Sequence, residues 1–116
     1  MKNRPLRRRL GFAAAGIRSA WVRERSFRTQ CVFAAAAMVA LIILRPPPIW
    51  WALVAVIAAT VLALELLNSA IEGVIDLLHP GIHPEIKIVK DMIAGAVLIV
   101  SIAALAVAGA LVKASL

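Results

Sequence analysis

The chain has 116 residues, 63% of them hydrophobic, and a mean hydropathy of +0.95. These values place it among membrane proteins with at most one domain, residues 1–116, and its single cysteine, Cys31, excludes an intrachain disulfide and a thiolate metal centre. The net charge of +7 would suit nucleic acid, but nine of the thirteen basic residues precede position 30. We therefore expect no nucleic-acid partner and a basic end against anionic lipid on the cytoplasmic side.

The first predicted element is an amphipathic helix over residues 6–28. Leu6, Leu10, Ile17 and Trp21 recur at helical spacing, and arginines occupy the other faces. This pattern is typical of a helix that lies in the membrane interface. The following apolar stretch, residues 31–44, is short for a span of about 20 residues. We extend it to about 29–45, with Arg28 reaching back to the lipid headgroups.

Two further spans follow. Arg45-Pro46-Pro47-Pro48 stops the first one, and a second span is predicted over about 50–76, with two tryptophans at its start in an aromatic belt. The segment 79–84, with two prolines and a glycine, ends that helix, and a third span is predicted over about 92–112. The predicted fold is an all-α integral membrane protein with one surface helix, three transmembrane helices, a cytoplasmic N-terminus and an inside loop of residues 77–90.

The end of the second span carries a polar stripe. Glu65, Asn68, Glu72 and Asp76 fall within an arc of roughly 80° on one helix face. A charged group at hydrocarbon depth costs about 2.5–3.5 kcal/mol even on insertion scales, so such groups usually have a function. The stripe therefore predicts a site for a metal ion or a proton.

The predicted topology brings other polar residues to the same interface. Glu24 and Glu72 could hold Mg²⁺, which takes one or two carboxylates together with phosphate oxygens and water. Glu65 lies deeper and suits a general base, while Lys90 beside Asp91 could bind phosphate. At this level a proton or cation conduit fits almost as well as an enzyme.

Two motifs narrow the choice. Glu65-Leu-Leu-Asn-Ser-Ala-Ile-Glu-Gly-Val-Ile-Asp76, followed after 13 residues by Lys90-Asp-Met-Ile-Ala-Gly-Ala-Val-Leu98, resembles the prokaryotic diacylglycerol kinase family. That family consists of small trimeric lipid kinases of the bacterial inner membrane and includes undecaprenol kinases. The resemblance extends over nearly the whole chain, with Ala20-Trp21 and Phe27-Arg28 in the surface segment.

The resemblance implies a role for each matching residue. Glu65 corresponds to the catalytic base that takes the proton of the lipid hydroxyl, and Glu24 and Glu72 correspond to the carboxylates that hold magnesium with the nucleotide. The remaining nucleotide-site residues it implies are His83, Lys90 and Asp91. The substrate-binding residues it implies are Arg18, Ser19, Trp21, Asn68 and Ala94.

The predicted function is an ATP- and Mg²⁺-dependent homotrimeric lipid kinase of the inner membrane that converts diacylglycerol to phosphatidate at the cytoplasmic face. Undecaprenol is the alternative acceptor, because Gln30 and Phe12 depart from the pattern of the best-known diacylglycerol kinases. A proton or cation conduit is the remote alternative.

Overall fold

A computed structural model describes residues 5–78, 81 and 83–116. Within these residues the chain forms α1 (Leu6–Arg23), α2 (Arg25–Leu44), α3 (Pro48–Leu78) and α4 (Pro84–Ser115). The predicted all-α fold is confirmed. Lys2 and Arg4 of the basic segment, and His79, Pro80 and Ile82 of the predicted helix break, lie outside the described residues.

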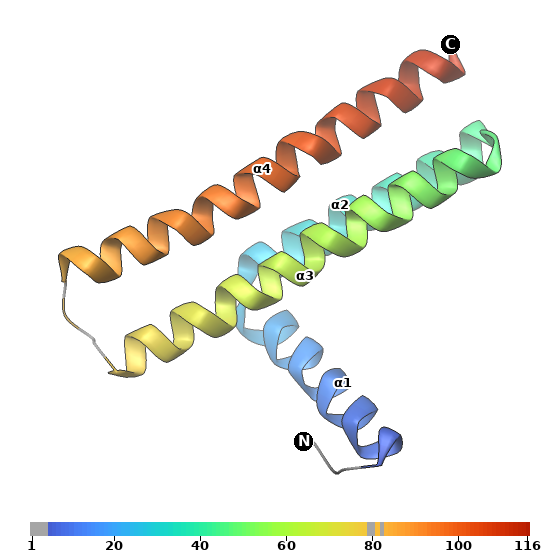
Figure 1. Ribbon diagram of the computed structural model, residues 1–116. Coiled ribbons are helices and arrows are strands. Elements are labelled where there is room, and N and C mark those ends of the chain that lie inside the picture. The colour runs from blue at the N-terminus through green and yellow to red at the C-terminus, as the bar shows by residue number, and fades with distance from the viewer. Residues whose placement is uncertain (1–4, 79–80, 82) are drawn as a thin grey trace.

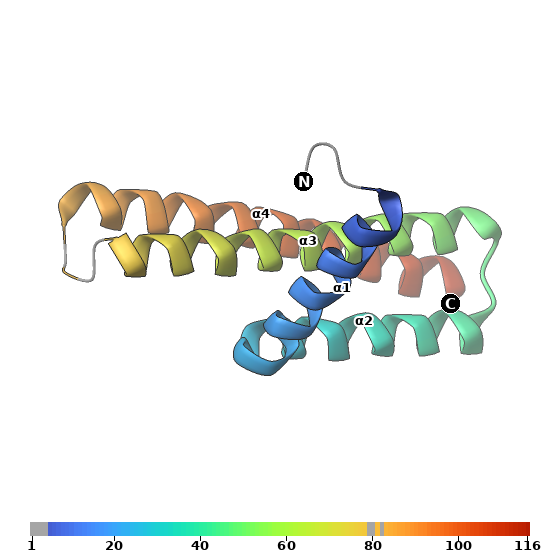
Figure 2. The same ribbon diagram turned by 90° about the horizontal axis from the view of Figure 1, so that it is seen from below.

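Helices α2, α3 and α4 form a bundle in which consecutive helices run in opposite directions (Figure 1). All three are long and apolar enough to cross a membrane. Helix α1 leaves the bundle at the start of α2 and lies across it, as Figure 2 shows from a second direction. The chain is thus built as a multi-pass membrane protein with one helix set apart from its spans.

The corner between α1 and α2 differs from the prediction. The surface helix ends at Arg23 and not at residue 28, because Glu24 has an extended backbone (φ −109°, ψ 107°). Arg28 lies on the first turn of α2. Its Nη1 donates to the carbonyl oxygens of Trp21 at 2.6 Å and Val22 at 3.1 Å. These carbonyls end α1 without helical partners, so the guanidinium caps that helix and stabilises the corner.

The opposite end of the bundle holds its core. Arg45 ends α2 in the left-handed region (φ 48°, ψ 55°), and its N–H donates to the Leu41 carbonyl oxygen at 2.9 Å. Leu41, Val54 and Leu111, one residue from each spanning helix, pack together there. The proline turn thus brings α2 and α3 together beside the last turns of α4.

Helices α3 and α4 are longer than a membrane requires. With 31 and 32 residues at about 1.5 Å per residue, each is roughly 47 Å long, against a hydrocarbon core of about 30 Å. Counted from Trp50, Glu65 lies roughly 22 Å along α3 and Glu72 roughly 33 Å. Against a core of that thickness beginning at Trp50, Glu65 falls in the half farther from the proline turn, and Glu72 falls near the far boundary.

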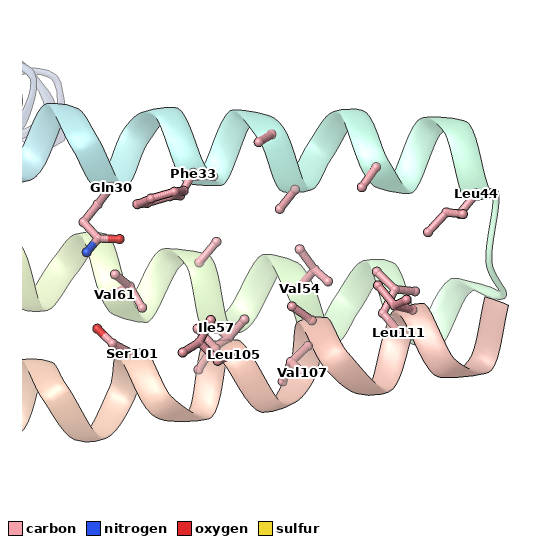
Figure 3. A pocket seen from close by; sticks show the side chains of 18 residues that line it. Gln30, Phe33, Leu44, Val54, Ile57, Val61, Ser101, Leu105, Val107 and Leu111 are labelled. Carbon is pink, nitrogen blue, oxygen red and sulfur yellow. The ribbon is translucent and has the colours of Figure 1, made fainter. Parts of the chain in front are cut away.

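A groove of about 500 Å³ lies between the three spanning helices (Figure 3). Its α2 wall is mostly alanine, and its polar lining residues are Gln30 and Ser101, which lie at the same end of the groove. Gln30 therefore belongs to this groove, and no hydrogen bond in the described chain joins it to Glu65.

Candidate active site

Glu65 is the centre of the polar stripe. Only 3% of its surface is exposed, and it is the one buried charged side chain among the residues described. The Ser26 hydroxyl donates a hydrogen bond to Glu65 Oε2 at 2.8 Å. A buried carboxylate needs such a partner, because transfer from water without one is costly. The pair joins the first turn of α2 to the middle of α3, close to the corner where α1 meets α2.

The sequence analysis missed Ser26. A helix continuing to residue 28 would have placed this serine on the surface element with no relation to α3. The break at Glu24 instead starts α2 at Arg25 and makes Ser26 its second residue. No sequence pattern marks this serine, because the helix break at Glu24 and the burial of Phe27 follow from packing.

The predicted metal carboxylates, Glu24 and Glu72, are both half-buried. Glu24 lies at the α1–α2 corner, two residues before Ser26, and Glu72 lies two turns beyond Glu65 on α3. In the described ranges neither side chain takes part in a hydrogen bond or ion pair. No group of three His, Cys, Asp or Glu residues in these ranges could hold a metal ion. Two free carboxylates still fit Mg²⁺ that also binds phosphate oxygens and water.

The lysine and aspartate that open the second motif have different partners. Lys90 Nζ lies 2.9 Å from Asp76 Oδ1, and Asp91 Oδ2 lies 2.7 Å from Lys87 Nζ, one helical turn away. Both lysines precede the apolar stretch 92–112. The hydrogen bond that Lys90 donates to Asp76 raises the pKa of Lys90, and the nearby Glu72 charge adds to this rise. Asp76, Glu72 and Lys90 therefore form one charged cluster where α3 ends and α4 begins.

A second groove, of about 530 Å³, lies where α1 crosses α2 and α3. Arg18 and Trp21, two of the predicted substrate-binding residues, line it together with apolar side chains of the other two helices. Leu62 and Leu66, which flank Glu65 on α3, belong to this lining. The groove therefore lies beside Glu65 and combines an apolar wall with one guanidinium, that of Arg18.

The other predicted residues lie apart from this groove. Ser19 is exposed on α1 outside its lining, Asn68 is half-buried one turn beyond Glu65, and Ala94 is exposed on α4. His83 caps α4: its Nδ1 accepts the Glu85 N–H at 3.1 Å, and Pro84 occupies the first helical position. This histidine thus has a local structural role, which the His-Pro-Glu order indicates.

Comparison with known proteins gives consistent matches. Residues 11–112 match the family described as prokaryotic diacylglycerol kinase. A protein of Synechocystis sp. named diacylglycerol kinase is 39% identical over 101 residues, which are 86% of this chain and 58% of that protein. Proteins of the same name from Escherichia coli and Shigella flexneri are each 36% identical over 94 residues, 81% of this chain and 77% of theirs.

Proposed function

The chain belongs to the prokaryotic diacylglycerol kinase family, and from this premise we propose that it transfers the γ-phosphate of ATP to diacylglycerol, forming phosphatidate and ADP. The observation that carries the proposal is the buried, hydrogen-bonded carboxylate of Glu65 beside an apolar groove. Such a groove suits acyl chains, and a carboxylate beside it suits proton transfer from a lipid hydroxyl.

The proposed reaction needs one proton transfer and one displacement. Glu65 accepts the proton of the lipid hydroxyl, and that oxygen forms a bond to the γ-phosphorus. The bond from the γ-phosphorus to the β–γ bridging oxygen breaks, and ADP leaves with that electron pair. Catalysis of phosphoryl transfer is mostly positioning and charge neutralisation. The protein therefore has to hold the hydroxyl, the base and the phosphates in line.

The charged end of the bundle suits the nucleotide. Glu24 and Glu72 would hold Mg²⁺, which when bound neutralises charge on the β- and γ-phosphates. Lys90, held beside Glu72 by Asp76, adds a cation for phosphate. Asp91 and His83 belong to the same end of α4 and complete the proposed nucleotide site.

The proposed setting is the bacterial inner membrane, with the N-terminus and the charged end of the bundle in the cytoplasm and with three copies of the chain per assembly. The basic residues of α1 support this orientation, because short cytoplasmic segments carry an excess of Lys and Arg. The resemblance alone supports the trimer. Crosslinking in a mild detergent tests it, and a fully active monomer would contradict it.

An acceptor assay tests the proposed function. Purified protein in mixed micelles with radiolabelled ATP and Mg²⁺ should label diacylglycerol faster than undecaprenol. Faster labelling of undecaprenol would replace diacylglycerol as the acceptor and keep the lipid-kinase chemistry. Ion flux in liposomes without ATP consumption, together with no labelling of either lipid, would instead identify a conduit.

A further inference from the structure

We propose that Ser26 is a positioning residue for Glu65, holding its carboxylate in the orientation that receives the proton of the lipid hydroxyl. The inference rests on the proposed function and adds a residue to it. It is carried by the 2.8 Å hydrogen bond from Ser26 Oγ to Glu65 Oε2, which joins residues 39 positions apart.

The bond leaves one carboxylate oxygen for the substrate. Ser26 uses Oε2, and no other described side chain bonds to Glu65. Every fully buried side-chain oxygen in the described ranges has a hydrogen-bond partner. Glu65 Oε1 has no such partner, so this oxygen is not fully buried. A glutamate side chain has several rotamers to lose, and a hydrogen bond to a charged acceptor is among the stronger ones. Ser26 thus restricts the base while leaving its second oxygen free.

Two features restrain the backbone around Ser26, whose own surface is exposed. Ser26 follows the extended residue Glu24 on the first turn of α2, where Arg28 ties this helix to the end of α1. Phe27, immediately after it, is 3% exposed. The capped corner and the buried ring therefore hold the serine against α3. Support of this kind is what a catalytic side chain needs to stay within about 0.5 Å of its productive position.

Neighbouring polar side chains do not offer the same contact. Asn68 lies one turn beyond Glu65, yet no hydrogen bond joins the two in the described chain, and Gln30 lines the groove between the three spanning helices. Removing the hydroxyl of Ser26 therefore leaves Glu65 without a side-chain partner.

The experiment compares Ser26→Ala, Ser26→Thr and a control, Thr29→Ala, in the diacylglycerol assay. The Thr29 hydroxyl lies on the same helix and donates only to the Arg25 carbonyl oxygen, at 3.1 Å. We expect Ser26→Ala to lower kcat about tenfold, the order of one lost hydrogen bond to a charged group, with KM for both substrates within about twofold. Ser26→Thr should restore kcat to within about threefold, and Thr29→Ala should equal the wild type.

The outcomes separate this inference from the proposed function. A wild-type protein that labels no lipid would refute the proposed function, on which the inference depends. An active wild type together with an unchanged kcat for Ser26→Ala would refute the role of Ser26 alone. If Ser26→Ala lowers the unfolding midpoint, its loss of kcat does not by itself show a positioning role, and the Ser26→Thr variant makes the distinction. A stable Ser26→Thr variant with a tenfold lower kcat would contradict the inference. A Ser26→Thr variant with restored kcat would support it.

Discussion

Replacing Glu65 by glutamine is the most direct test of the proposed base. Glutamine has nearly the same shape, and its amide oxygen can still accept the Ser26 hydroxyl hydrogen, so the contact at 2.8 Å can be kept. What disappears is the ability to take a proton. General-base catalysis contributes about 10²- to 10⁴-fold, which corresponds to about 2.7–5.4 kcal/mol in the activation barrier. We expect kcat to fall by that factor.

The free energy of unfolding of Glu65→Gln should be higher than that of the wild type or equal to it. The carboxylate is 97% buried, counted from its exposed fraction of 3%, and an uncharged amide loses less on leaving water than a carboxylate does. The assay is the initial rate of radiolabel transfer from ATP to diacylglycerol, with unfolding in mild detergent followed in parallel and nucleotide affinity measured by equilibrium binding.

Two results would contradict the role of Glu65 as the general base. A Glu65→Gln rate above about a tenth of the wild-type rate would show that this carboxylate is not the base, because the smallest expected loss is about a hundredfold. A loss of ATP affinity equal to the loss of rate would place Glu65 in the nucleotide site instead. Retained ATP affinity with a lost rate is the expected pattern.

Three further changes test other parts of the structure. Glu72→Gln should lower activity in a way that raised Mg²⁺ partly restores, measured as the magnesium dependence of the rate, and identical loss at every concentration would contradict a metal role. Asp76→Asn should leave the unfolding midpoint unchanged near neutral pH and change KM for ATP by no more than about fivefold, because its pair with Lys90 is exposed. Because Asp76 raises the pKa of Lys90 above 10.5, the ion pair is intact below that value and is lost as pH rises through the raised pKa. The KM for ATP of the wild type should therefore not change between pH 7 and 9 because of this pair. A change over that range that the wild type shows and Asp76→Asn does not would refute the argument. Leu41→Ala should lower the free energy of unfolding in detergent by about 1–2 kcal/mol. This is less than the roughly 2–5 kcal/mol typical of a water-soluble core, because lipid replaces water around the separated helix. An unchanged free energy of unfolding would argue against a core formed by Leu41, Val54 and Leu111.

The sequence predicts much of this architecture because the residues that end its helices can be recognised by their type. Pro46, Pro47 and Pro48 remove backbone donors and stop a helix, and the runs on either side of them are apolar. Helical spacing also places Glu65, Glu72 and Asp76 on one face, and the structure pairs the last of these with Lys90. Proline positions and helical spacing are therefore enough to predict this part of the structure.

The α1–α2 corner was beyond those rules. Helical periodicity continues through Glu24, which is neither proline nor glycine, and the hydrogen bonds from Arg28 to Trp21 and Val22 that cap α1 there do not follow from that periodicity. The contact between Ser26 and Glu65 follows from that corner and joins distant parts of the chain. Such contacts arise from packing, and a one-dimensional pattern does not contain them.

The length of α2 has a consequence for the membrane in which the protein works. With 20 residues it is about 30 Å long and has no turns to spare, while α3 and α4 project well past the same thickness. A thicker or thinner bilayer can slide along the two long helices, but around α2 it must stretch, compress or tilt the helix, and each such mismatch has an energetic cost. The bilayer thickness that suits this protein is therefore set by its shortest spanning helix, the one that carries Ser26 on its first turn.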